Sequence, residues 1–266
     1  MNKHFEGWKS EEHKITFDVW NKMSKSQFKY IFSSFEENKY LLETIGNKEE
    51  SLLDYGCSSG YLKRYLNLKN KKKINYTGFD ISEKSIKIAK EKYGENNFFD
   101  NLSALPKKKY DLVYSRDTIL HQIDPWKFLE QLASKTKKNL ILRLRTRDKG
   151  ATLLDVQNSC QLIKGDYWVP YIVLNYDEFL NNLKKLGFKF IKINRSYTVL
   201  GGYNKRFLER SLYLKETGTS ETSVLASFEN NGSKDLIETF VLEGHNFLKK
   251  KKFTTLFYKI LNKINI

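Results

Sequence analysis

The sequence predicts an α/β fold built on a doubly wound, mostly parallel sheet, and three observations predict it. From Ser51 onwards, short apolar runs alternate with amphipathic segments, which is typical of parallel strands joined by crossover helices. The first apolar run ends in an acid and a loop of small residues, as at nucleotide sites in such sheets. With 266 residues, the chain is long enough to bury a substantial core.

Composition narrows the class of protein. Cys57 and Cys160 are too few for a disulfide framework, and the amino-terminal segment lacks the apolar core of a signal peptide. No run approaches the roughly 20 apolar residues of a membrane span, so we expect a cytoplasmic protein with reduced thiols. The net charge of +16 would attract polyanions or anionic lipid. Lysine is spread along the whole chain, however, which favours compositional drift over a polyanionic partner as the cause of the charge.

The first elements follow in chain order. Residues 5–45 place apolar side chains at roughly helical spacing and predict an amino-terminal helical cap. Ser82, with Glu83 directly after it, is expected to cap a helix. The predicted strands are 51–56, 74–81, 110–115 and 139–145, and the helices between them are 61–68, 82–93 and 124–136.

The alternation ends after Arg147. Residues 177–193 predict a helix that ends at Gly187 and then a strand, and 210–215 predict a last, antiparallel strand. The stretch after that is rich in Ser, Thr, Asn and Gly, as in loops. These assignments divide the chain into the cap at 1–48, a main domain at 49–216, a loop or linker at 217–233, and a basic helical tail at 234–266.

The loop from Gly56 to Gly60 is the first candidate for a binding site, because glycine lets a ligand approach the backbone closely. Dinucleotide folds need Gly-x-Gly-x-x-Gly, but Ser58 takes the middle position and the Tyr61 ring would block close packing at the third. The Gly-Lys-Ser/Thr of a Walker loop is absent from the sequence. Asp54, just before the loop, suits a cationic ligand or a bound water rather than a pyrophosphate.

A second acid points the same way. Asp80 ends the predicted strand 74–81, 26 positions after Asp54. At the end of a second strand, a carboxylate can accept hydrogen bonds from both hydroxyls of a ribose. The loop and its two acids therefore predict a site for a ligand that carries a ribose and a positive charge.

These residues resemble the class I S-adenosyl-L-methionine (SAM) dependent methyltransferases. The run from Asp54 to Gly60 matches the family's Asp/Glu-x-Gly-x-Gly-x-Gly motif, with Ser58 for the middle glycine. The likeness covers about 50–215. It implies SAM as the cofactor and a Rossmann-like sheet of seven strands whose last strand is antiparallel. The cofactor-binding residues that it implies are Asp54, Gly56, Cys57, Ser58, Gly60, Asp80, Ile81, Asp100, Asn101 and Arg116.

Asp100 and Asn101 are alternatives for one contact to the cofactor. Residues 98–106 resemble the family's third-strand segment, whose Asp or Asn meets the adenine amino group, and both Asp100 and Asn101 fit.

Residues 153–215 resemble methyltransferases encoded in bacterial surface-polysaccharide gene clusters. The likeness consists of a Gln-Asn pair, a Pro-Tyr segment and a helix that ends in Leu-Gly-Phe: Gln157, Asn158, Pro170, Tyr171 and Gly187.

Two residues after the fourth strand are candidates for catalysis. If the acceptor is a hydroxyl, the protein must orient it and take up its proton. His121 is our first choice as the general base, because the unperturbed pKa of histidine lies near neutral. In the alternative interpretation, His121 lines the cofactor pocket or lies at the start of a helix and takes no proton. Asp117 is the second candidate, and it could equally cap the helix.

The acceptor site is expected on the fifth strand and the insert after it. Arg143, Arg145 and Arg147 alternate and therefore share one face of that strand. Either they hold a phosphate or carboxylate of the acceptor, or one pairs structurally while the others lie beyond the strand end. We take Arg143 and Arg145 as substrate-binding, together with Trp168 and Tyr171, whose rings either suit a sugar or pack as core or lid. We assign no metal ligands.

The tail carries a basic amphipathic helix at 249–266, with apolar residues on one face and lysines beside them. This helix either docks on its own domain or a partner subunit, or contacts the inner face of an anionic membrane near a lipid-linked glycan.

Together these features predict a SAM-dependent methyltransferase that O-methylates a sugar or related small molecule in polysaccharide biosynthesis. One alternative is a tRNA or rRNA methyltransferase, which the positive charge would suit. Against it, the sequence has no recognised RNA-binding module, and 115–118 read Ser-Arg-Asp-Thr where base-directed amino methyltransferases often have Asn/Asp-Pro-Pro-aromatic. The other alternative is a scaffold that binds SAM without catalysis.

Overall fold

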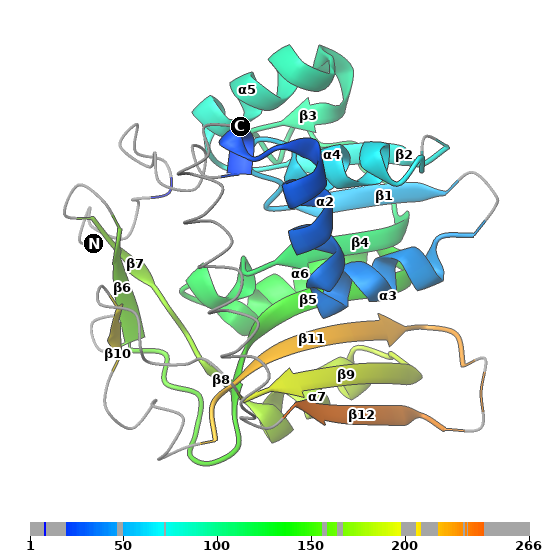
Figure 1. Cartoon of the computed structure of the whole chain (residues 1–266). Coiled ribbons are helices and arrows are strands. Elements are labelled where there is room, and N and C mark those ends of the chain that lie inside the picture. Colours follow the sequence, from blue (N-terminus) through cyan, green and yellow to red (C-terminus); the bar gives the residue numbers. More distant parts are fainter. Residues whose placement is uncertain are drawn as a thin grey trace.

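The structure, a computed structural model, has a central sheet with helices on both faces (Figure 1). It describes residues 8, 20–46, 50–71, 73–155, 159–163, 167–197, 206–208, 218–230, 232 and 234–241. The strands of the central sheet are β1 (Ser51–Tyr55), β2 (Asn75–Phe79), β3 (Phe98–Phe99), β4 (Tyr110–Arg116), β5 (Thr136–Arg147), β8 (Leu174–Asn175), β9 (Phe190–Ser196), β11 (Ser220–Ser227) and β12 (Leu236–Val241).

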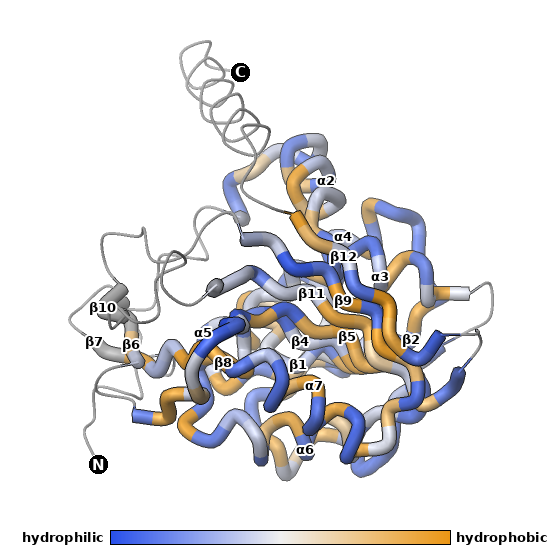
Figure 2. The backbone as a smooth tube through the Cα atoms, turned by 90° about the horizontal axis from the view of Figure 1, so that it is seen from below, coloured by the Kyte–Doolittle hydropathy of each residue, from blue (hydrophilic) through white to orange (hydrophobic). Residues whose placement is uncertain are grey.

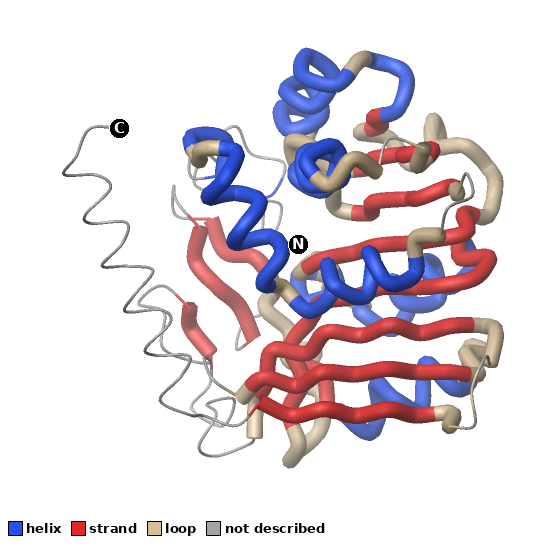
Figure 3. Tube along the Cα trace, turned by 45° about the vertical axis from the view of Figure 1, so that its right-hand side comes forward, coloured by secondary structure: helices blue, strands red, loops and turns tan. Residues whose placement is uncertain are grey.

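A second, three-stranded sheet stands apart from the central one (Figure 3), and helices complete the fold. The strands of this small sheet are β6 (Ser159–Ile163), β7 (Tyr167–Pro170) and β10 (Arg206–Leu208). The helices are α2 (Lys25–Ser34), α3 (Glu36–Thr44), α4 (Tyr61–Leu68), α5 (Glu83–Tyr93), α6 (Pro125–Lys135) and α7 (Tyr176–Lys185), with short 3-10 helices η2 (Glu95–Asn97) and η3 (Ile119–His121). No helix among the described residues has the length and apolarity to cross a bilayer.

The sheet order confirms the predicted fold class. Eight strands follow the order β12-β9-β11-β5-β4-β1-β2-β3, and β8 pairs with the end of β5. Strands β1, β2, β4 and β5 are parallel, whereas β11 runs antiparallel to both of its neighbours. The chain leaves β1 toward β2 and β3 and later returns to β4 on the other side. The ends of β1 and β4 therefore lie at the switch point, where ligands bind in such sheets.

Two apolar layers hold the sheet between its helices. On one face, α2, α3, α4 and α5 pack their buried rings and aliphatic chains on residues such as Leu52, Leu112 and Ile141. On the other, α6 and α7 cover Leu53, Val113 and further strand residues. Figure 2 shows α6 and α7 on one side of the strands and α2, α3 and α4 on the other. Both layers exclude water from the strands, which explains their nearly continuous apolar runs.

The predicted strands and helices from 51 to 145 form where the sequence places them, and local signals explain their ends. The Ser82 side chain accepts a hydrogen bond from the Ser85 backbone and caps α5, as expected. Helix α6 begins after Asp124, which caps it, so the expectation that Asp117 caps a helix is wrong. Gly187 has a φ of +91° just after α7, a left-handed backbone that favours glycine there.

The amino-terminal helices are part of the main domain rather than a separate cap. Phe28 and Phe32 of α2 and Tyr40 of α3 are buried in the same apolar layer as the strands. Helix α3 also supplies the buried carboxylate of Glu37. Of residues 1–19, the structure describes Trp8 alone.

The interpretation of 217–233 as a loop or linker is wrong. Residues 220–227 form β11, a buried strand between β5 and β9 that belongs to the main domain. Its serines and threonines suggested a loop, but they are accommodated in a buried strand because their hydroxyls are hydrogen-bonded within the sheet. The Thr146 hydroxyl lies 2.7 Å from that of Thr222 and 3.1 Å from that of Ser220.

The start of the predicted helical tail is also wrong. Residues 236–241 form β12, which pairs in parallel with β9 at the edge of the sheet and is largely exposed. Its backbone hydrogen bonds to β9 and its β-branched and aromatic residues favour the strand. The antiparallel strand expected at 210–215 and the basic helix expected at 249–266 lie outside the described residues.

Candidate active site

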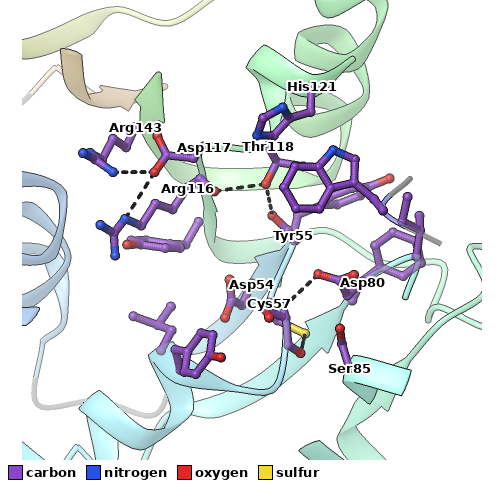
Figure 4. A pocket seen from close by; sticks show the side chains of 18 of the residues that line it. Asp54, Tyr55, Cys57, Asp80, Ser85, Arg116, Asp117, Thr118, His121 and Arg143 are labelled. Atoms are coloured by element: carbon purple, nitrogen blue, oxygen red, sulfur yellow. Dashed lines mark hydrogen bonds and ion pairs between the residues drawn. The ribbon is translucent and has the colours of Figure 1, made fainter. Parts of the chain in front are cut away.

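A cavity of about 610 Å³ opens at the carboxyl ends of β1, β2 and β4 (Figure 4). It is bounded by the loop after β1, the end of β2, the segment after β4 and the face of β5. Its charged and histidine side chains are Asp54, Asp80, Arg116, Asp117, His121, Arg143, Arg145 and Glu221, and Trp8, Trp20, Phe32, Ile81 and Leu102 are among its apolar ones.

The glycine loop is shaped by its backbone. Gly56 has a φ of +87°, and its N–H donates to the Phe79 carbonyl over 2.7 Å. A Cβ atom at Gly56 would lie 2.2 Å from the Thr118 hydroxyl, so no other residue fits without a shift. Ser58 also has a left-handed backbone, with a φ of +49°, at the position where the family's motif has its middle glycine. The serine therefore adopts the conformation for which glycine is usual.

Asp80 joins the ends of β1 and β2. One carboxylate oxygen accepts the Ser58 N–H over 2.8 Å, and the other accepts the Ser82 N–H over 2.9 Å. Burial raises the pKa of Asp80, and these two backbone bonds oppose that rise. The carboxylate thus fixes the loop against the second strand while its edge faces the cavity.

Asp54 is a buried acid at the bottom of the cavity. The residue is 3% exposed, and its carboxylate accepts a hydrogen bond from the Tyr76 hydroxyl over 2.6 Å. Burial raises its pKa to about 7, which the Tyr76 bond opposes and the nearby Asp80 charge reinforces. A positively charged ligand in the cavity would favour the ionised carboxylate and lower this pKa.

Most of the predicted cofactor residues meet at this cavity, and three do not. Asp54, Gly56, Cys57, Ser58, Asp80, Ile81 and Arg116 line it. Gly60 lies behind the lining, where a Cβ atom would come within 2.8 Å of the Tyr93 ring, so its role is close packing. Asp100 and Asn101 are not among the lining residues; Leu102 takes that place, and the Asn101 oxygen accepts bonds from Ser103.

The arginines of β5 share one face, as predicted, and acids pair with two of them. Arg143 and Arg145 each pair with both Asp117 and Glu221, and Glu221 lies directly across from Arg145 on β11. Arg147 instead donates to the backbone carbonyls of 149 and 151. All three arginines are nearly buried, so the alternative in which two of them lie beyond the strand end is wrong.

Asp117 is positioned as a partner of arginines. Burial alone would raise the pKa of its carboxyl, but Arg143, Arg145 and Arg116 outweigh burial and hold it well below the usual range. Figure 4 shows Asp117 with its contacts to Arg116 and Arg143. A carboxylate that binds protons so weakly is a poor general base at neutral pH.

His121 lies on η3 at the cavity wall. Its Nδ1 is 2.7 Å from the Pro170 carbonyl, which can only accept, so Nδ1 carries the hydrogen. In the neutral ring the proton-accepting nitrogen is then Nε2. Tyr171 is 2% exposed and lies behind His121 rather than at the cavity, so its predicted place at the substrate is not supported. Trp168 lies on β7, and its side chain is outside the described part.

Sequence reasoning missed four residues of the site. Glu37, which is 1% exposed, contacts Arg116 over 3.2 Å and accepts from the Ser223 hydroxyl over 2.9 Å. Glu221 pairs with the arginines of β5. Trp8 and Trp20 line the cavity. The two tryptophans within the polar amino-terminal segment were an available signal, whereas nothing near Glu37 or Glu221 in sequence indicated arginine partners.

The comparison with known families decides the class of the protein. The sequence profile of the family described as "Methyltransferase domain" matches residues 28–193, more than half of the 266 residues. The chain belongs to this methyltransferase family. The match begins in α2 and ends in β9, so it includes both the glycine loop and the helices that the sequence assigned to a cap.

Individual relatives are more distant. The methyltransferase is 25% identical over 192 residues to the ubiquinone biosynthesis O-methyltransferase of Pelagibacter ubique, covering 69% of this chain and 76% of that protein. Its fold is similar to that of a candidate sarcosine dimethylglycine methyltransferase from Galdieria sulphuraria, at 14% identity and a TM-score of 0.56, covering 86% and 100% of the two chains. An O-methyltransferase from a Brevibacillus brevis polyketide synthase gives 13% identity, a TM-score of 0.54, and coverage of 82% and 80%.

The residues at the cavity fit SAM. Asp54 and Asp80 supply carboxylates for a ligand with a positive charge and a ribose, and the positive φ of Gly56 brings the loop backbone to the cavity. Together with the family match, this fit confirms the predicted enzyme class, a SAM-dependent methyltransferase. Among the described residues, no group of three or more His, Cys, Asp or Glu side chains is placed to hold a metal ion.

Proposed function

We propose that this methyltransferase transfers a methyl group to a hydroxyl oxygen of a sugar or related small molecule, within the assembly of a surface polysaccharide. One observation carries the proposal: a single cavity joins the cofactor loop to a histidine whose ring the Pro170 carbonyl orients through Nδ1, and to a wall of carboxylates and tryptophan rings. The similarity to an enzyme named as an O-methyltransferase supports oxygen as the accepting atom. The polysaccharide part rests on the sequence resemblance of 153–215.

The chain's own residues divide the work. When bound, SAM would supply a methyl group from its positively charged sulfur to the acceptor oxygen, and the hydroxyl proton of the acceptor would pass to the protein. Asp54, Asp80 and the loop at Gly56 hold and orient the cofactor. His121 accepts the hydroxyl proton on Nε2, while the Pro170 carbonyl fixes its ring through Nδ1. Asp117 stays ionised and stabilises the imidazolium that forms, because its negative charge lies near His121.

The role of His121 is tested by His121→Gln. We expect kcat to fall by about 10²–10⁴-fold, the usual contribution of a positioned general base. The affinity for SAM, measured by calorimetry on the same preparation, should change by less than about threefold, because the cofactor loop is intact. A kcat near that of the unmodified enzyme would assign proton transfer to another group or to water.

The accepting atom is tested directly on products. The purified enzyme is incubated with methyl-labelled SAM and with monosaccharides, sugar nucleotides or lipid-linked glycans. We expect label on a sugar, with a methyl group on oxygen identified by NMR. Label on nitrogen would contradict the proposal.

A tRNA or rRNA methyltransferase is the second candidate, because the net charge of +16 favours a polyanion. It predicts methyl incorporation into RNA and an affinity for tRNA that falls steeply with salt. Incorporation into RNA with none into any sugar would replace the first proposal with this one.

A further inference from the structure

The acceptor side of the cavity has an alternating array of charges, which we call the acid–arginine array: Asp117, Arg143, Glu221 and Arg145. Arg143 contacts one oxygen of Asp117 and lies 2.8 Å from Glu221. Arg145 lies 2.9 Å from the other Glu221 oxygen and 3.3 Å from the other Asp117 oxygen. Each guanidinium therefore bridges both carboxylates through its two terminal nitrogens.

The two kinds of charge are not equally accessible in this array. The arginine side chains are 10% and 6% exposed at positions 143 and 145, whereas those of Asp117 and Glu221 are 31% and 26% exposed. Burial alone would raise the pKa of Glu221, but Arg145 and Arg143 hold it below its usual value, so the acid stays ionised. A ligand in this part of the cavity therefore meets carboxylate oxygens before it meets guanidinium hydrogens.

The charges also balance. Beyond the array, Arg116 lies 3.2 Å from Glu37, and its guanidinium stacks 3.8 Å from the centre of the Phe35 ring. Three arginines thus meet three acids, so the charges on this side of the cavity balance. To pair with Arg143 or Arg145, a phosphate or carboxylate on the acceptor would have to displace Asp117 or Glu221 from these buried arginines, which is costly. A hydroxyl can instead donate to the lone pairs that each carboxylate keeps.

An aromatic surface completes this side of the cavity. The Trp8 and His121 rings are 4.5 Å apart between centroids, and both residues line the cavity. A wide apolar face beside hydrogen-bond acceptors suits a sugar, which has an apolar ring face and hydroxyls at its edge.

We infer that the acceptor is an uncharged polyhydroxylated molecule, whose hydroxyls donate to the exposed carboxylate oxygens of Asp117 and Glu221. Acceptors that carry a phosphate or carboxylate at the ring bound in this part of the cavity are excluded. This inference deepens the proposed function and rests on it. It rejects the alternative, left open by the sequence, in which the arginines of β5 hold a phosphate or carboxylate of the acceptor.

The test compares matched probes on the unmodified enzyme. The full chain is saturated with S-adenosylhomocysteine, so that binding is measured without turnover. Probes are methyl glucoside, methyl glucuronide, glucose 6-phosphate and methyl glucosaminide, and the matching galacto and manno series, with saturation-transfer NMR and competition as readouts. We expect the tightest-binding neutral probe to bind at least tenfold tighter than its acidic and phosphorylated counterparts. Equal or tighter binding of the acidic probes, or tighter binding of the protonated amine, overturns the inference.

Glu221→Gln sharpens the test, because it removes one charge and keeps the shape. It should lower the affinity for the neutral probe by about tenfold, as expected for a lost charge-assisted hydrogen bond. It should raise the affinity for the acidic probe, because two arginines lose a partner. The ratio between the two probes should fall at least tenfold. Glu91→Gln makes the same change on the exposed face of α5 and should leave the ratio unaltered. An unchanged ratio in Glu221→Gln, with cofactor binding intact, counts against the inference.

Failure of this inference differs from failure of the proposed function. If acidic sugars bind and are methylated on oxygen, the proposed function stands and the inference falls. If RNA or an amine is methylated and no sugar binds, the proposed function falls and the inference with it.

Discussion

The two halves of the cavity are built in different ways. The cofactor half, Asp54 to Gly60 with Asp80, uses backbone groups and single acids, and its Ser58–Asp80 bond joins positions 22 apart. The acceptor half consists of the acid–arginine array with Arg116 and Glu37. Its Arg143–Glu221 pair joins positions 78 apart, and Glu37 contacts Ser223 from 186 positions away.

This difference explains which kind of substitution disrupts each half. In the cofactor half, shape depends on φ angles and close approach, so a single added carbon is disruptive. In the acceptor half, several side chains share the charges, so removing one carboxylate leaves a buried arginine partly unpaired. We therefore expect backbone substitutions to reduce cofactor binding and charge substitutions to reduce stability and acceptor binding.

The largest expected effect is on the acceptor half. Glu37→Gln removes the charge that faces Arg116 and Arg143 from a side chain that is 1% exposed, so we expect a stability loss of about 3 kcal/mol. Chemical denaturation measures it, and the affinity for SAM at a temperature where the variant is folded should be unaltered. The control is Glu43→Gln on the same helix, an exposed partner of Lys192, with an expected loss under about 0.5 kcal/mol. Equal stability losses in the two variants would show that the buried ion pairs of Glu37 contribute no more than an exposed one.

The second effect is on the cofactor half. Gly56→Ala places a Cβ atom on the Thr118 hydroxyl at a φ of +87°, and we expect the affinity for SAM to fall at least 100-fold, about 2.7 kcal/mol. Calorimetry measures it. Gly94→Ala is the matched control, because Gly94 has a φ of +95° and no neighbour within 4 Å of its would-be Cβ atom. It should lose about 1 kcal/mol of stability and bind SAM normally. Similar affinities in the two variants would mean that close approach is unimportant.

The sequence predicted the cofactor half well because its signals are local. Asp54, Gly56, Ser58 and Asp80 lie at or directly after strand ends that the apolar pattern marks. In the acceptor half, the sequence indicated Arg143, Arg145 and Asp117 but not Glu37 or Glu221, because no spacing rule links those two acids to the arginines of β5. Strand β11 was missed for a related reason: serine and threonine indicate a loop unless their hydroxyl partners, here on β5, are known.

A third prediction concerns Asp54, the buried acid of the cofactor half. Burial raises the pKa of Asp54 to about 7 from 3.8, so between these values the folded protein keeps a proton that the unfolded chain has released. Stability therefore falls as the pH rises through this window, and above pH 7 the whole cost of the charge is present. Asp54→Asn removes that cost. We expect the cofactor-free variant to be about 2 kcal/mol more stable than the unmodified protein at pH 8.

The pH dependence provides the control for Asp54→Asn. At pH 4 the carboxyl is protonated in the folded protein, so the gain should nearly disappear. The affinity for SAM at pH 8 should fall about tenfold, because an ionised carboxylate near a cationic ligand is lost. A gain in stability that does not depend on pH would assign the effect to packing.

The smallest effect is expected for Ser58→Gly, which isolates the backbone of the cofactor half. Ser58 has a φ of +49°, and an ordinary side chain there costs about 1 kcal/mol. Glycine removes that strain but loses more chain entropy on folding, by about 0.5–1 kcal/mol. The two terms nearly cancel, so stability should change by less than about 1 kcal/mol and the affinity for SAM by less than twofold. The bond from this residue's N–H to Asp80 is a backbone bond and survives the change. A large loss of affinity, measured by calorimetry, would mean that the Ser58 side chain itself contacts the cofactor, and that the cofactor half also depends on side chains.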